Sequence, residues 1–201
     1  MPPDDNPSLA LLQRVTQSYL SRDITREEMI SVRTAISQHL LPLMDNEYKI
    51  FVLGSYGDGE KQYLETVQEI LRDEYRNRCS SRARVFLMDD VPGDDIWINL
   101  GIKFRLLADI SDSIVGVAEN DQGGFMFEQG IIATHEDYVR KTHLLKRQYA
   151  SKKEEHSHYS AMQASGLFDE LRTDDRLFEW RDTQGLAAST IAAFERIEKG
   201  N

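Results

Sequence analysis

Residues 49–53 read Lys-Ile-Phe-Val-Leu, a short continuous run rich in apolar residues. Such a run is typical of a strand that is buried on both faces, as strands are in parallel sheets. The loop Gly54-Ser-Tyr-Gly-Asp-Gly59 follows, and apolar residues then recur at helical spacing from Glu60 to about Asn77. This succession of strand, loop and helix is the unit that decides the fold class.

The same unit recurs along the rest of the chain. Strands are predicted over 84–88, 113–118, 142–145 and 176–181, and helices over 96–108, 125–135, 159–171 and 184–198. Alternation of this kind predicts parallel strands with helices on both faces of the sheet. We therefore expect an α/β fold with an open, mostly parallel sheet of four to five strands, in three layers of the flavodoxin or Rossmann type. The 176–181 strand is expected at an edge.

The region before the first strand has a different pattern. Apolar residues recur at helical spacing over 8–21, and Thr25 with Glu28 matches a capping box that opens a second helix, over 25–41. This helical pair either packs on the core or forms a subunit contact in a homo-oligomer. We expect residues 1–45 to be an N-terminal helical extension and residues 46–201 to be a single α/β domain.

The composition indicates which kinds of partner and which cellular compartment to expect. The net charge of −10 argues against nonspecific binding to nucleic acid, because phosphate contacts require Lys and Arg. No apolar run approaches the roughly 20 residues that span a bilayer, and residues 1–7 lack the pattern of a secretory signal. The single cysteine, Cys79, fits a reducing compartment. We expect a cytoplasmic protein that does not associate with membranes.

Three loops lie where ligands bind in open α/β sheets, beyond the carboxyl ends of the strands. They are residues 54–59, 89–95 and 119–124, and they carry glycines or carboxylates. The glycines of the first loop either let the backbone approach an anion or serve turn geometry alone. Tyr56 either stacks on a ring or covers the end of the sheet. The first loop matches neither the GxGxxG fingerprint nor a Walker A loop.

Glu128 falls near the first turn of the helix after the 113–118 strand. A carboxylate there feels the positive end of the helix dipole, which favours its ionised form. Flanked by Phe125 and Phe127, an ionised carboxylate suits a nucleophile or a stabiliser of an oxocarbenium ion. A surface glutamate that complements the dipole fits the same spacing, and spacing alone favours this second interpretation.

Three segments around Glu128 resemble the nucleoside 2-deoxyribosyltransferase-like superfamily. They are Asp112-Ser-Ile-Val-Gly-Val-Ala118, Asp121-x-Gly-Gly124 and Phe127-Glu-Gln-Gly130. The Gly54-Ser-Tyr56 segment also resembles that family's first loop, and TIR-type NAD-cleaving domains share the general architecture. The resemblance covers roughly residues 49–145. The chain departs from the family in a longer interval from Asp121 to Glu128 and in Gly123-Gly124-Phe125, which replaces a Gly-Thr pair.

The resemblance implies that Glu128 attacks or stabilises the anomeric carbon of a nucleoside, with Asp121 near the sugar. It also implies a set of substrate-binding residues, to which Asp89 is added by position: Gly54, Ser55, Tyr56, Asp89, Asp112, Gly123 and Gly124. The acid that protonates the leaving group has four candidates, also by position: Asp89, Asp90, Asp94 and Asp95. The expected reaction is cleavage or transfer of an N-glycosidic bond in a nucleoside, nucleotide or NAD-like small molecule, without a cofactor or metal. Two alternatives remain, namely a non-catalytic nucleotide-binding or signalling module and a helix-mediated assembly protein.

Overall fold

A computed structural model describes the following residues of the chain: 25–27, 30, 34, 36–40, 48–57, 59–79, 83–91, 100–120, 124–159 and 166–200. The chain divides into two compact units. One comprises Met1–Asn46 and Asp89–Ile110, and the other comprises Glu47–Met88 and Ser111–Asn201.

The first unit contains a π-helical turn, η1 (Ile36–Leu40), and the helix α4 (Leu100–Ile110). Within α4, Phe104 and Leu107 are buried and Leu100 is exposed. This helix matches the later part of the helix predicted over 96–108. The helices predicted over 8–21 and 25–41 fall largely outside the described residues.

The second unit is built on a five-stranded sheet in which all strands are parallel. Its strands are β1 (Tyr48–Gly54), β2 (Ala83–Leu87), β3 (Ser113–Ala118), β4 (Thr142–Arg147) and β5 (Leu177–Trp180). Their spatial order is β2-β1-β3-β4-β5, so β5 forms one edge. The short 3₁₀ helix η3 (Met88–Asp90) follows β2. The predicted open parallel α/β sheet is confirmed.

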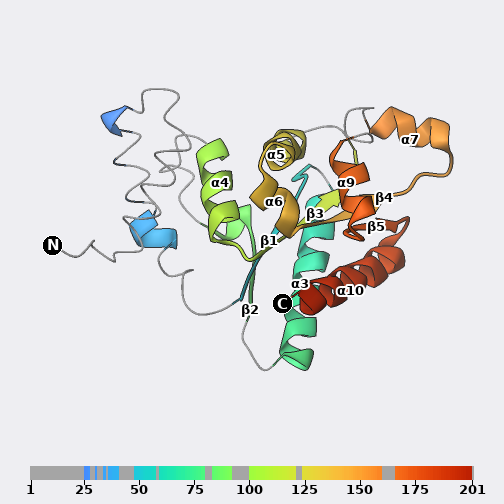
Figure 1. Ribbon diagram of the computed structural model, residues 1–201, viewed down its shortest axis with the longest axis horizontal. Helices are drawn as coiled ribbons and strands as arrows, with labels where there is room; N and C mark the ends of the chain where they lie inside the picture. The colour runs from blue at the N-terminus through green and yellow to red at the C-terminus, as the bar shows by residue number, and fades with distance from the viewer. Residues whose placement is uncertain are drawn as a thin grey trace. The chain divides into compact units, whose positions relative to one another are not determined.

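Helices cover both faces of this sheet, which gives three layers (Figure 1). One face carries α3 (Lys61–Arg78) and α10 (Thr183–Gly200), which pack against each other. The other carries α5 (Gly124–Ala133), α6 (Glu136–Lys141) and α9 (Leu167–Thr173), and α7 (Lys152–His158) follows β4. None of the described helices has the length and apolar character needed to cross a membrane.

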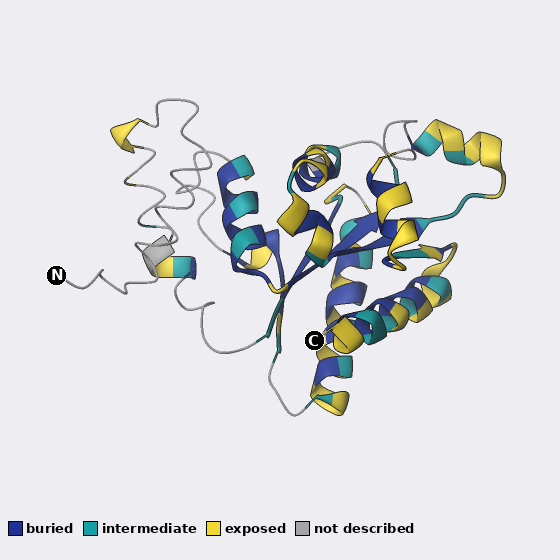
Figure 2. Ribbon diagram, in the orientation of Figure 1, coloured by how far each residue is buried: buried dark blue, intermediate teal, exposed yellow. Residues whose placement is uncertain are grey.

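The strands carry the core because both of their faces are covered. Every residue of β3 is buried, and α3, α9 and α10 each combine buried residues with exposed ones (Figure 2). Trp180 of β5 is buried beside Tyr63 of α3, with ring centroids 5.3 Å apart. Tyr75 of α3 meets Phe194 of α10 edge to face at 5.2 Å. These aromatic contacts join the two helices of one face to the sheet edge.

The structure differs from the predicted elements in the second half of the chain. The helix predicted over 159–171 is wrong in its extent, because the structure has α7 before Tyr159 and α9 from Leu167, while residues 160–165 lie outside the described part. Ser151 begins α7 by accepting a hydrogen bond from the backbone N–H of Glu154 at 3.2 Å. The short α6 was not predicted, and β4 extends two residues beyond Leu145.

Candidate functional site at the carboxyl edge of the sheet

The carboxyl ends of β1 and β3 form the point where the chain changes its direction of winding. The chain leaves β1 for α3 on one face of the sheet and leaves β3 for α5 on the other face (Figure 1). In open α/β sheets a crevice forms between two such strands, and ligands bind there. The site can therefore be built from the residues that directly follow Gly54 and Ala118.

A hydrogen bond joins the two loops at this point. The side-chain amide of Asn120, after β3, donates to a carboxylate oxygen of Glu60, at the start of α3, over 2.8 Å. On the β1 side, the hydroxyl of Ser55 accepts from the backbone N–H of Gly57 at 3.4 Å. The loops are thus linked by polar side chains, which are the groups that a polar ligand at this edge would meet.

Glu119 directly follows β3, and its side chain is 5% exposed. One carboxylate oxygen lies 3.3 Å from Nη1 of Arg147, the last residue of β4. Burial raises the pKa of Glu119 to about 7, and the negative charge of Glu60 acts in the same direction, whereas Arg147 opposes both. A carboxyl group with this pKa exchanges its proton near neutral pH, as general acids and bases do.

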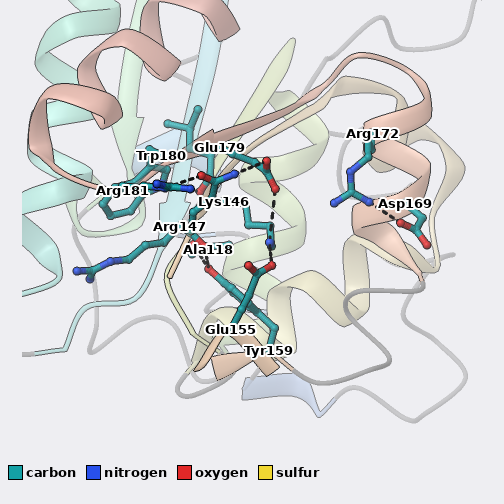
Figure 3. A network of polar contacts seen from close by, with 12 residues as sticks. Ala118, Lys146, Arg147, Glu155, Tyr159, Asp169, Arg172, Glu179, Trp180 and Arg181 are labelled. Atoms are coloured by element: carbon teal, nitrogen blue, oxygen red, sulfur yellow. Dashed lines mark hydrogen bonds and ion pairs between the residues drawn. The ribbon is translucent and has the colours of Figure 1, made fainter. Parts of the chain in front are cut away.

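The polar contacts at the ends of β3 and β4 form a connected network (Figure 3). The hydroxyl of Tyr159 lies 2.8 Å from the backbone oxygen of Ala118 and 3.0 Å from that of Arg147, so it bridges the two strands. The hydroxyl of Tyr149 donates to the backbone oxygen of Glu119. The guanidinium of Arg147 lies over the ring of Trp180, 5.3 Å from its centroid. These contacts fix the position of Arg147.

Lys146 extends the network toward α7 and β5 (Figure 3). The side chain is almost fully buried, and its ammonium group forms an ion pair with Glu155 and lies 3.6 Å from Glu179. It also lies 5.1 Å from the ring centroid of Tyr159. A buried ammonium requires such partners, and here they attach α7 to the carboxyl ends of β4 and β5.

Glu128 lies within α5 and is only 9% exposed. Its Oε2 atom is buried and makes no hydrogen bond within the described part of the chain. The neighbouring Phe125 is buried against Gly116 of β3, where a Cβ on that glycine would lie 3.0 Å from the ring. Phe127 is 63% exposed, so only one of the two rings expected to flank Glu128, that of Phe125, is buried.

The ionisation expected for Glu128 is also wrong in direction. Burial raises the pKa of its carboxyl to about 8, so the group is mainly protonated at neutral pH. Desolvation outweighs the helix dipole because the dipole acts with a modest strength near a helix end, whereas removal of a carboxylate from water is far more costly. Such a shifted, unpartnered carboxyl in a folded protein marks a candidate functional group.

The predicted residues of the first loop have local structural contacts. A Cβ on Gly54 would lie 2.4 Å from Leu64 and 3.0 Å from the backbone oxygen of Val117, so close packing requires the glycine. The Tyr56 hydroxyl accepts from the backbone N–H of Met88 at 3.1 Å, which ties the loop after β1 to the end of β2. Ser55 is half-buried and Tyr56 is 36% exposed at the carboxyl edge.

The remaining predicted residues do not all gather at this edge. Asp112 lies at the opposite, amino edge, where its carboxylate accepts from the backbone N–H of Lys49 at 2.7 Å. Strand β3, six residues or about 20 Å long, separates it from Glu119. Asp89 is exposed in η3 and belongs to the other compact unit. Gly124 begins α5, whereas Asp121 and Gly123 lie outside the described residues.

Sequence reasoning missed Glu119, Arg147 and the tyrosines that hold them. One sequence feature could have pointed to Glu119, because it directly follows a strand that is entirely apolar after its first residue. No sequence feature pointed to Arg147, because the predicted strand ended at Leu145. His158 stacks on Tyr149 at 3.9 Å between ring centroids. Within the described part of the chain, no group of three His, Cys, Asp or Glu residues is placed to hold a metal ion.

Sequence comparisons assign the chain to a family without assigning an activity. No curated protein matches the chain significantly. A family model described as "Family of unknown function (DUF8170)" matches residues 1–175, which is most of the chain. The protein therefore belongs to the family of unknown function DUF8170.

Proposed function

We propose that the protein cleaves or transfers the N-glycosidic bond of a nucleoside, nucleotide or NAD-like small molecule, with Glu128 as the group that attacks or stabilises the anomeric carbon. The observation that carries this proposal is the buried Oε2 atom of Glu128, which has no hydrogen-bond partner within the described part of the chain. A buried polar atom without a partner lowers stability. A role in binding or catalysis would account for its presence.

The position of α5 supports the same proposal. The helix follows β3 at the carboxyl edge, next to the point between β1 and β3 where such sheets bind ligands. The segment from Asp112 to Gly130 resembles nucleoside 2-deoxyribosyltransferase-like enzymes, which use a glutamate at the position of Glu128. Asp121, which precedes α5 in that segment, is proposed to lie near the sugar.

Because the pKa of Glu128 is raised, its carboxyl brings a proton into the proposed reaction. As the carboxylate bonds to the anomeric carbon, the carbon–nitrogen bond breaks and its electron pair leaves with the base. The carboxyl of Glu128 holds a proton at neutral pH, and the departing base takes up this proton to become neutral. Water then hydrolyses the ester, which frees the sugar and restores the carboxyl, or a second base attacks in transfer. A nicotinamide leaving group takes up no proton, so in that case the proton of Glu128 passes to solvent.

The experiment is a comparison of the wild-type chain with two glutamate variants. Each is incubated with NAD and with a panel of deoxynucleosides, and free base is measured by chromatography. Glu128→Gln preserves shape but removes the nucleophile, so base release should fall by at least about 10³-fold. Glu65→Gln changes an exposed glutamate of α3 and should release base at the wild-type rate. Equal release by wild type and Glu128→Gln would contradict the proposal.

One observation favours a second function, a non-catalytic nucleotide-binding module. A carboxyl that is mainly protonated at neutral pH is a poor nucleophile but can donate a hydrogen bond to a ligand. Thermal denaturation with the same nucleotides separates the two functions. A ligand that raises the melting temperature without being consumed would support the binding module, because binding to the folded state alone stabilises it.

A further inference from the structure

A cavity of about 480 Å³ lies at the amino edge of the sheet, the edge opposite to Glu119 and Arg147. Residues at the starts of three strands line it, namely Tyr48 of β1, Ser113 of β3 and His143 of β4. The last turns of α10 contribute Arg196 and Ile197. Its volume falls within the range of pockets that bind small molecules. The proposed glycosidic site does not include it.

The lining of this cavity is positive although the chain is acidic overall. Four lining side chains are Arg or Lys and two are Asp, which leaves an excess of two positive charges in a chain of net charge −10. Ion pairs with groups outside the lining do not change this excess. Lys49 offsets Asp112 at 3.5 Å, and Asp137 offsets Arg140 at 2.7 Å.

Two of the lining arginines, Arg176 and Arg196, differ in how many of their N–H donors are already used in hydrogen bonds. Arg176 is largely committed, since its guanidinium donates to the backbone oxygen of Thr142 at 3.2 Å and to Asp174 at 2.5 Å. Within the described part of the chain, Arg196 makes a single long contact, 3.4 Å to the backbone oxygen of Asp174, and forms no ion pair with a carboxylate. A guanidinium has five N–H donors, so Arg196 retains most of them.

His143 supplies an independent indication of a ligand. It lines the cavity and is 6% exposed, and its Nδ1 atom makes no hydrogen bond within the described part of the chain. Burial lowers the pKa of His143 to about 4, and the charges of Arg176 and Arg196 act in the same direction, against the backbone oxygen of Lys141. The positive potential at the imidazole is therefore produced by the same arginines that line the cavity.

We propose that this cavity binds a small phosphate monoester, whose phosphate contacts Arg196 and the imidazole of His143. A phosphate monoester carries a charge of about −1.5 to −2 at neutral pH, which matches the excess of two positive charges in the lining. Arg176 and Lys141 hold the strand starts and add to the positive field. The cavity volume leaves room for the organic part of the ligand beside the phosphate. This site is independent of the proposed glycosidase activity.

Calorimetric titration of the full chain tests this proposal, with glycerol 3-phosphate as the probe at a fixed ionic strength of chloride. Saturable binding at one site is expected. Arg196→Gln removes the least committed guanidinium and should weaken binding by about tenfold or more, as loss of a charged hydrogen bond does. Arg172→Gln is the matched control, because Arg172 pairs with Asp169 on α9 and does not line the cavity (Figure 3). It should leave the dissociation constant within about twofold.

A second measurement does not depend on a variant. The ring resonances of His143 in NMR spectra should shift with the same saturation curve as the calorimetric signal. Absence of saturable heat, equal weakening in Arg196→Gln and Arg172→Gln, or unshifted His143 resonances at saturation would each overturn the proposal. Malonate, a dicarboxylate titrated in parallel, should bind more weakly than glycerol 3-phosphate. Equal or tighter binding of malonate would overturn the assignment to phosphate.

Discussion

The carboxylate of Glu119 and the guanidinium of Arg147 lie 3.3 Å apart at the carboxyl ends of the adjacent strands β3 and β4. The glutamate is almost fully buried, whereas about a third of the arginine side chain is exposed. This arginine is the cation that opposes the burial-raised pKa of Glu119. The pair therefore controls whether Glu119 carries a negative charge at the proposed ligand edge near neutral pH.

Arg147→Met should destabilise the protein in a pH-dependent way. Without the guanidinium the pKa of Glu119 should rise further above its present value of about 7, because burial and Glu60 then act unopposed. The free energy of unfolding should fall by about 1–2 kcal/mol at pH 8, where Glu119 is charged. The loss should be smaller at pH 5, where Glu119 is protonated. Urea denaturation at both pH values measures this, and an equal loss at both would contradict the role of the pair.

Glu128→Gln should remove a pH dependence from the stability of the wild-type protein. The folded-state pKa of about 8 lies above the ordinary value of 4.5, so the folded state binds this proton more tightly than the unfolded state. The resulting stabilisation is fully present below about pH 4.5 and is lost as the pH rises through 8. The variant, neutral at all pH values, should therefore be more stable than wild type at pH 8.5, by on the order of a few kcal/mol.

The comparison needs a second glutamate as its control. Glu65→Gln alters an exposed side chain of α3 and should follow the pH dependence of the wild-type protein. Denaturation curves at pH 5 and pH 8.5 suffice for all three proteins. If the stability difference between wild type and Glu128→Gln were the same at both pH values, Glu128 would not carry the raised pKa.

The parallel sheet could be predicted because its evidence is local. Segments 50–53 and 114–118 are continuous apolar runs, and burial on both faces of the sheet requires this pattern whatever the rest of the chain does. The end of β4 could not be predicted in the same way. Lys146 and Arg147 interrupt the apolar pattern, and they fit in the strand only because Glu155, Glu179 and Glu119 offset their charges.

The candidate site shows the same division between local and tertiary causes. The helix position of Glu128 followed from spacing, and the helix dipole suggested an ionised carboxylate. Its actual protonation depends on desolvation, which arises from how α5 packs and leaves no trace in the spacing of residues. The position of Asp112 before β3 was also evident, but its hydrogen bond to the backbone of Lys49 at the amino edge depends on strand pairing.

Two glycine variants near Glu128 should have opposite effects on stability. In Gly116→Ala, the new Cβ would lie 2.8 Å from the side chain of Leu144 and 3.0 Å from the ring of Phe125, so these two buried side chains must move. We expect a loss of about 1–3 kcal/mol. Gly130, inside α5, has open space around its Cβ position, and Gly130→Ala should stabilise the protein by about 0.5–1 kcal/mol. Chemical denaturation of both variants gives the two signs, and a destabilised Gly130→Ala would show that α5 packs differently from the structure.

Tyr159→Phe should loosen the end of α7 from the carboxyl edge of the sheet. The lost hydroxyl lies 2.8 Å from the backbone oxygen of Ala118 and 3.0 Å from that of Arg147, and these oxygens would lose a donor in a largely buried place. The expected cost is about 1–2 kcal/mol in the free energy of unfolding. The ring stays in place against Lys146 and Phe168, so the fold should persist. Hydrogen exchange should become faster in residues 148–159 and unchanged in β1, whereas uniform acceleration would indicate general destabilisation and not local release of α7.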